Sequence, residues 1–240
     1  MKLSFVHLAL SALLLAPVAV SAQTPTQPST QPPRTTILID PAHGGSDSGA
    51  HVADRVIEKE VNFAIANRLR ALLTARAFDV ILTRNDDTNP AMDERASIGN
   101  TAHPLACIVL HSSGTGSGVH LFASALPAAA PVQSSKVPWD SIQSTYVTKS
   151  LKLENLLTTA MTRGRIPVSA SRAWVQPLDS MLCPAIAIEV APLKGIASTT
   201  NPDDEGYQQR IAATIASALL TWKQQTDAQQ PAPTAGGTHP

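Results

Sequence analysis

Short apolar runs alternate with helical patterns along most of this chain, and that alternation limits the folds that it can adopt. The runs Thr36–Asp40 (TILID) and Ala106–Leu110 (ACIVL) have the length and continuous apolar character of buried strands. Between them, Val61, Ile65 and Leu69 recur at the spacing of one helical face. Strands that alternate with helices pack as layers around a mainly parallel or mixed sheet. We therefore expect an α/β fold in a single domain.

The same patterns place the remaining elements. Further strands are expected over Phe78–Thr83, Val119–Ala123 and Pro184–Val190, and helices over Ala91–Asn100 and Ser141–Thr162. A last helix is expected to open with Asn201 as its cap and Pro202 in its first turn. Its predicted core stripe is Tyr207, Ile211, Ile215, Leu219 and Trp222.

Composition separates the two ends of the chain from one central domain. Of the 240 residues, 43% are hydrophobic and 15% are charged, which suits a chain that buries one globular core. Residues 23–34 are rich in Pro, Thr and Gln and predict a linker, and residues 226–240 predict a disordered tail of similar character. The domain is expected over residues 35–225.

The N-terminus has the character of a signal peptide. Lys2 precedes an apolar stretch from Leu8 to Val20, and Val20, Ser21 and Ala22 supply the small residues that a signal peptidase accepts. This stretch is shorter than the roughly 20 residues of a spanning helix. Residues 1–22 are therefore expected to be cleaved from a chain exported to the periplasm, the cell wall or the extracellular space. A retained membrane anchor is the alternative.

Charge and aromatic content argue against two classes of partner. The formal net charge is zero and only 4% of the residues are aromatic, with no basic stripe along the chain. Nucleic-acid and anionic-membrane surfaces need such stripes, so neither partner is expected. We expect a monomer that is not stably inserted in a membrane.

Three residues far apart in the sequence predict an open zinc site. His43 follows the first strand, His111 ends the third, and Glu58 precedes the first helical pattern. Two imidazoles and a carboxylate suit Zn²⁺, and three protein ligands leave a fourth position for a reactive water. Sheets of this class bind ligands beyond the carboxyl ends of their strands. Glu60 competes with Glu58 for the ligand role, but it is expected to lie within the first turn of the helix.

Glu189 is the candidate catalytic residue. It closes the apolar strand that begins near Pro184, and a carboxylate is costly to bury there without a partner. A metal ion or its water would supply that partner, which makes a functional role for Glu189 the favoured interpretation.

Other polar residues have mainly structural interpretations. Asp47 either orients a ligand histidine or shapes the turn that follows His43. His51, His103 and His120 lack a flanking motif and are not expected to bind metal. Cys107 and Cys183 lie too far along their strands from the zinc residues to be ligands. A disulfide between the two cysteines and two buried thiols are both open interpretations.

The motifs in their order resemble the zinc-dependent N-acetylmuramoyl-L-alanine amidases of the type-3 amidase family. The resemblance covers Thr36 to about Trp222. It rests on several sequence motifs: IDPAHGG, EKEVNFAIA, LTRNDD, DERASIGN, IVLH, GVHLF and PAIAIE. It implies a twisted, largely parallel sheet of six strands. It also implies that His43, Glu58 and His111 bind zinc, that Glu189 is catalytic, and that the substrate is the amide between muramic acid and L-alanine in peptidoglycan.

Two segments depart from the family pattern. The family's second histidine is usually followed by a small residue and Asn, whereas Ser112 and Ser113 follow His111 here. Its glutamate is commonly followed by Gly-Phe, whereas Ala191 and Pro192 follow Val190 here. These departures leave the ligands unchanged and concern substrate contacts, the residues that support the ligands, and the preferred stem peptide.

Two other functions remain open from the sequence. One is a different zinc peptidase or deacylase on a similar scaffold, because the metal chemistry is shared. The other is a catalytically silent wall-binding protein. The need for an activator protein is not apparent from the sequence.

Overall fold

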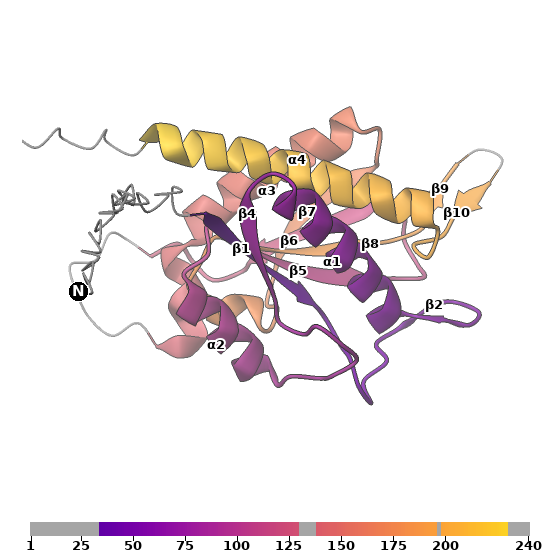
Figure 1. Ribbon diagram of the computed structural model, residues 1–240, viewed down its shortest axis with the longest axis horizontal. Coiled ribbons are helices and arrows are strands. Elements are labelled where there is room, and N and C mark those ends of the chain that lie inside the picture. Colours follow the sequence, from indigo (N-terminus) through magenta and orange to yellow (C-terminus); the bar gives the residue numbers. More distant parts are fainter. Residues whose placement is uncertain (1–33, 130–137, 196–197, 230–240) are drawn as a thin grey trace, which may run out of the picture. The chain divides into compact units, whose positions relative to one another are not determined.

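A mixed sheet of six strands forms the centre of the fold (Figure 1). Its order is β4 (Phe78–Leu82), β1 (Thr35–Pro41), β5 (Ala106–Ser112), β8 (Ala185–Val190), β6 (Val119–Ser124) and β7 (Val168–Ala173). Neighbouring strands are parallel except for β6 and β8, which are antiparallel. The predicted α/β fold with a mixed six-stranded sheet is confirmed. The computed structural model describes residues 34–129, 138–195 and 198–229.

Helices cover the two faces of the sheet unequally (Figure 1). The helices α1 (Glu58–Thr74), α3 (Val147–Arg163) and α4 (Glu205–Gln229) pack on one face. On the other face lie α2 (Met92–Ala102) and the short 3₁₀ helix η2 (Leu178–Ser180). A second 3₁₀ helix, η1 (Trp139–Thr145), precedes α3, and two small hairpins complete the fold: β2 (His51–Ala53) with β3 (Val56–Ile57), and β9 (Leu193–Lys194) with β10 (Thr199–Thr200).

Alternation along the strands divides the core into a large and a small cluster. Ile37 and Ile39 of β1 point into the large cluster beneath α1, α3 and α4, while Leu38 points into the small one. The small cluster also contains Val109 and Ala187, which precede His111 and Glu189 by two residues each. The side chains of His111 and Glu189 therefore emerge on the face of the sheet that α2 covers, beyond the last residues of the small apolar cluster.

The elements differ from the sequence predictions in a few places. Strand β7 was not expected, because an edge strand needs no continuous apolar face and five of its six residues are polar or alanine. The helix expected from Ser141 begins as η1 and becomes α-helical only at Val147. Asp204, and not Asn201, caps α4, since its Oδ1 accepts the N–H of Tyr207 at 2.7 Å. The helix continues through Gln229, so the expected tail boundary at residue 226 falls inside it.

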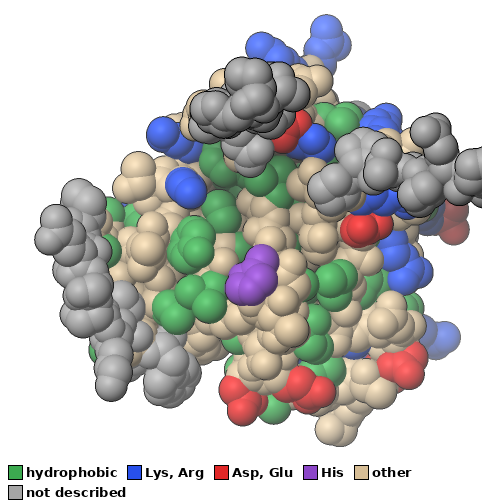
Figure 2. Space-filling model, turned by 60° about the vertical axis from the view of Figure 1, so that its left-hand side comes forward, with side chains coloured by type: hydrophobic (Ala, Val, Ile, Leu, Met, Phe, Trp, Pro, Cys, Tyr) green, Lys and Arg blue, Asp and Glu red, His purple; other side chains and the backbone are tan. Residues whose placement is uncertain are grey.

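Several predictions concern residues outside the described ranges. The expected signal peptide and nearly all of the expected linker occupy residues 1–33, and residues 230–240 of the expected tail also lie outside. Within the part of the chain that the structure describes, no helix combines the length and the apolar character of a membrane span. The face in Figure 2 carries basic and acidic side chains scattered among hydrophobic and uncharged ones.

A disulfide joins Cys107 to Cys183, which decides between the two interpretations of the cysteines. Cys107 lies near the start of β5 and Cys183 just before β8, so the bond links the N-terminal ends of two neighbouring parallel strands. Both cysteines belong to the small cluster. Those strands carry His111 and Glu189 at their other ends.

Loss of the disulfide should lower stability measurably. The bond closes a loop between residues 76 positions apart, for which chain entropy gives a stabilisation of about 4 kcal/mol. We expect the double variant Cys107→Ala/Cys183→Ala to lose about 2–4 kcal/mol of unfolding free energy in urea. An unchanged denaturation midpoint, or two free thiols in the native wild-type chain, would contradict the prediction.

Candidate metal centre

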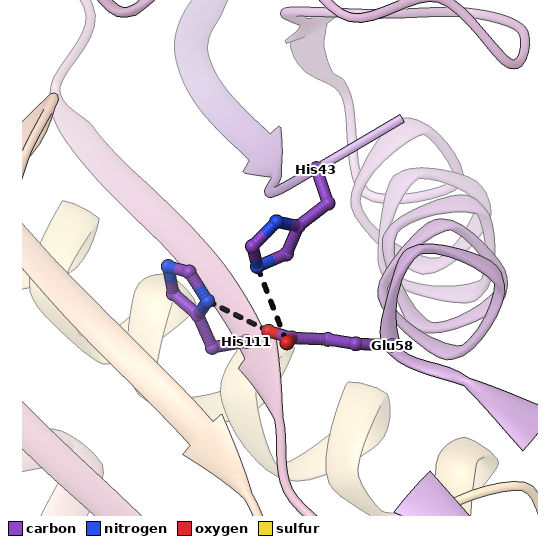
Figure 3. Close-up of side chains that lie close together, drawn as sticks. All are labelled: His43, Glu58 and His111. Carbon is purple, nitrogen blue, oxygen red and sulfur yellow. Dashed lines mark hydrogen bonds and ion pairs between the residues drawn. The ribbon is translucent and has the colours of Figure 1, made fainter. Parts of the chain in front are cut away.

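His43, Glu58 and His111 converge on one point at the carboxyl end of the sheet (Figure 3). Each offers one ligand atom, and these atoms lie within 4.8 Å of one another. His43 Nε2 is 3.2 Å from Glu58 Oε2, and His111 Nδ1 is 2.7 Å from Glu58 Oε1. Both imidazoles thus face the same carboxylate, His43 from the loop after β1 and His111 from β5, and their ring centroids are 5.4 Å apart.

A tight turn aims His43 at the centre. His43 adopts a left-handed φ of 64°, and the backbones of Gly44 and Asp47 pair across the turn. Asp47 Oδ2 lies 2.8 Å from His43 Nδ1, where it accepts the proton of that nitrogen and leaves Nε2 directed toward Glu58. The hydrogen bond with His43 also lowers the pKa of Asp47. Asp47 both orients the histidine and shapes the turn, because its Oδ1 accepts the N–H of Gly49.

Glu58 is a buried carboxylate held by several donors. It is the first residue of α1 and is 5% exposed, whereas Glu60 is exposed to solvent. The backbone N–H groups of Ala50 and Ser112 donate to it at 2.9 and 3.2 Å. Burial pushes the pKa of Glu58 upward, but the hydrogen bonds with His111 and Ala50, with the nearby histidine charges, bring it to about 2. The carboxylate is therefore negative at neutral pH.

Asn62 and Ser112 support this carboxylate, and sequence reasoning gave Asn62 no role. Asn62 Nδ2 lies 3.4 Å from Glu58 Oε1 and 3.3 Å from the carbonyl oxygen of Ala42. The Ser112 hydroxyl donates to Asn62 Oδ1 at 2.7 Å. Asn62 stands one helical turn after Glu58, and that spacing is a signal that would have found it. Ser112, one of the departures from the family pattern, belongs to the support of the ligand.

A buried ion pair between α2 and β1 supports the loop that carries His43. Arg95 on α2 lies 2.6 Å from Asp40 in β1, and both side chains are about 1% exposed. The same guanidinium donates to the carbonyl oxygen of His43 at 3.0 Å. Arg84 Nε donates to the carbonyl oxygen of Pro41, and its Nη2 donates to that of Lys59 on α1. These arginines tie the loop after β1 to α1 and α2.

Glu189 stands beside the three-residue centre and not within it. Glu189 on β8 is the register partner of His111 on β5, so the two side chains emerge side by side on one face. The carboxylate of Glu189 forms no hydrogen bond or ion pair with the residues that the structure describes. Of the three histidines not expected to bind metal, His51 lies on β2, His103 ends α2, and His120 is on β6. None of them belongs to the centre.

The donor set of the centre fits a divalent zinc ion. Two imidazole nitrogens and one ionised carboxylate oxygen form the His₂Glu combination of open zinc sites. Asp47 fixes one imidazole, and Asn62 and two N–H groups fix the carboxylate, which is the outer support that such ligands require. This arrangement has the ligands, charge and orientation for hydrolytic metal chemistry.

Comparisons with known proteins agree with one another. The family model described as N-acetylmuramoyl-L-alanine amidase, Amidase_3, matches residues 37–221. The N-acetylmuramoyl-L-alanine amidase LytC of Bacillus subtilis (strain 168) is 37% identical over 82 residues, which are 34% of this chain and 16% of LytC. The germination-specific N-acetylmuramoyl-L-alanine amidase of the same organism is 27% identical over 202 residues, 78% of each chain. The matched segments span between 16% and 27% of the first curated amidases.

A solved structure shows the same fold. The catalytic domain of CwlV, an N-acetylmuramoyl-L-alanine amidase from Bacillus (Paenibacillus) polymyxa var. colistinus, superposes with a TM-score of 0.61. The two sequences are 20% identical over 79% of this chain and 98% of that one.

Gly49 provides a test of the metal centre that leaves its ligands in place. A Cβ on Gly49 would lie 2.7 Å from both Glu58 Oε2 and His43 Cδ2, so Gly49→Ala should push these two groups apart. We expect zinc affinity, measured by competition with a chromophoric chelator, to fall by about 10-fold or more.

Gly45→Ala is the matched control for this variant. Gly45 also has a positive φ, but its Cβ would meet Asn89 at an ordinary 3.4 Å. We expect it to lose stability to a similar degree while zinc affinity stays within about threefold of wild type. Equal zinc affinity in the two alanine variants would contradict the assignment.

Proposed function

Since this chain belongs to the Amidase_3 family of N-acetylmuramoyl-L-alanine amidases, we propose that it hydrolyses the amide between N-acetylmuramic acid and L-alanine in peptidoglycan. One observation carries the proposal: His43, Glu58 and His111 meet at the end of the sheet with Glu189 beside them. The order of the sequence motifs supports the same family.

Zinc is the proposed cofactor. His43 Nε2, a Glu58 carboxylate oxygen and His111 Nδ1 would hold it, because these atoms already face one another. When bound, zinc supplies Lewis-acid chemistry that polarises a carbonyl and lowers the pKa of water towards about 7. The low pKa of Glu58 keeps that ligand ionised under the same conditions.

Glu189 is the proposed general base and acid. It takes a proton from the attacking water and returns that proton to the departing nitrogen of L-alanine, so it ends the cycle in its starting state. Two observations support this role: Glu189 is the register partner of His111, so that the two side chains emerge side by side, and Glu189 is not among the three residues of the centre. The segment after Glu189 is held by Tyr207 on α4, whose hydroxyl donates to the carbonyl oxygen of Ala191 at 3.0 Å.

Export is part of the proposal, because peptidoglycan lies outside the cytoplasm. The Cys107–Cys183 disulfide supports it, since such bonds persist mainly in oxidising compartments. The N-terminal sequence also supports export, because residues 1–22 have the character of a signal peptide.

The Glu189→Gln variant separates catalysis from metal binding. Its amide keeps the shape of the side chain but cannot carry the proton, so we expect activity on purified sacculi to fall by at least about 100-fold. Zinc content should remain near that of wild type. His111→Ala should lose both zinc and activity, whereas Glu60→Gln, an exposed carboxylate on the same helix turn, should lose neither.

The identity of the released ends decides between the amidase and its rivals. Free stem peptides and intact glycan strands are the expected products of wild-type digestion. Cleavage within the stem peptide would indicate a zinc peptidase, and loss of acyl groups without peptide release would indicate a deacylase. Zinc binding without any turnover would indicate a silent wall-binding protein.

Removal of the metal should abolish activity reversibly. We expect an excess of a zinc chelator to stop sacculus digestion and stoichiometric Zn²⁺ to restore it, because Glu189 alone cannot polarise an amide carbonyl. Circular dichroism during chelation provides the control, since the two hydrophobic clusters do not depend on the ion. Full activity in the metal-free protein would rule out zinc dependence.

A further inference from the structure

Four polar residues form one row across the sheet next to the metal centre. His111 on β5 is in register with Glu189 on β8, Glu189 with His120 on β6, and His120 with Ser169 on β7. Register partners emerge on the same face of a sheet, with directly opposed antiparallel partners about 4.5–5.5 Å apart at Cβ. His120 is therefore a direct neighbour of Glu189, on the side away from His111.

Two neighbouring members of this row, the Nε2 atom of His120 and the carboxylate of Glu189, have no hydrogen-bond partner among the described residues. The Nε2 atom of His120 is buried and forms no hydrogen bond with the residues that the structure describes. Glu189 has none within those residues either. A buried ring nitrogen without a partner is costly, and each such group in a native fold calls for an explanation.

The other nitrogen of the His120 ring is engaged. Ser169 Oγ lies 3.3 Å from His120 Nδ1, on the neighbouring edge strand. If the hydroxyl donates to Nδ1, the ring proton is on Nε2, and Nε2 becomes a donor directed away from Ser169.

The loop before β6 holds the ring in place. Gly116 has a φ of 83°, and a Cβ there would lie 3.2 Å from His120 Nε2 and 3.5 Å from the Cβ of Ala191. Backbone bonds from Gly118 to Pro192 and from Ala191 to Gly118 fasten this loop to the end of β8. The loop backbone therefore covers Nε2 close to the strand end that carries Glu189.

We propose that His120 is a positioning residue for Glu189: the Ser169 hydroxyl donates to Nδ1, and the Glu189 carboxylate, which no described residue holds in this structure, turns toward its register partner and accepts the Nε2–H. This inference rests on the proposed amidase function. The hydrogen bond fixes one carboxylate oxygen and leaves the other free to exchange a proton with water and the leaving nitrogen. His120 keeps its own proton throughout, so the proton balance of the reaction is unchanged.

The kinetic test compares His120→Leu with His120→Gln on a soluble muropeptide, using the zinc-loaded full chain. Leu removes both ring nitrogens, whereas the Gln amide offers a donor near the position of Nε2. We expect His120→Leu to lower kcat by about 10-fold with KM within about twofold of wild type. His120→Gln should recover most of that loss, and the zinc content should be equal in all variants.

Two serine variants on the same strand provide a matched pair. Ser169→Ala removes the partner of Nδ1, and we expect it to lower kcat by about two- to fivefold. Ser171→Ala removes an exposed hydroxyl two residues along β7, whose register partner is Phe122, and should leave kcat unchanged. A His120→Leu kcat within twofold of wild type, or a loss that His120→Gln does not recover, would overturn the proposal.

An NMR measurement tests the contact without relying on turnover. In the zinc-loaded protein, Glu189→Gln removes a negative charge next to His120, so the pKa of His120 should fall by at least about 0.5. An unchanged pKa would overturn the positioning role even if the amidase is active. A wild-type chain without turnover that still shows this coupling would refute the proposed function and leave the contact between His120 and Glu189 standing.

Discussion

The buried carboxylate of Glu58 is the constraint on which the site depends. A negative charge at 5% exposure is stable only when donors surround it, and here the donors come from three separate parts of the chain. Ala50 donates from the loop after β1, Asn62 from α1, and Ser112 from β5, while His111 faces the same oxygen as Ser112. Satisfying one charge therefore assembles the elements that carry both histidines, and it leaves a cluster with the charge and orientation to bind a cation.

The two faces of the sheet are covered unequally, and the histidines of this cluster are partly exposed at the strand ends, His43 at 22% and His111 at 29% of their side chains. Three helices pack on one face against the large cluster, whereas α2 and η2 cover the other face with a much smaller apolar cluster. Beyond that cover, the strand ends carry polar residues. The Arg95–Asp40 ion pair and the Cys107–Cys183 disulfide brace the same face from the buried side. Rigid strands and a braced loop are the support that a hydrolytic centre requires, because its groups must be held close to the reactive geometry.

The sequence predicted the parts of the fold that obey periodicity and missed those that depend on tertiary contacts. Buried strands such as β1 and β5 were visible as apolar runs, and the three residues of the candidate metal centre were visible because each ends, follows or precedes a predicted element. Strand β7 (VSASRA) carries no such pattern, because it is an edge strand held by pairing with β6. His120 looked unremarkable for a related reason. Its relation to Glu189 exists only through antiparallel pairing of two strands that are far apart in the sequence.

X-ray absorption at the zinc K-edge tests the central claim most directly, because it reports the ligand atoms in solution. The account predicts one zinc per chain with two imidazole nitrogens and one carboxylate oxygen at about 2.0–2.2 Å, and the loss of one imidazole in His43→Ala. A first shell containing sulfur, or one that keeps two imidazoles when His43 and His111 are replaced together, would show that the ion binds elsewhere. Either result would contradict the account.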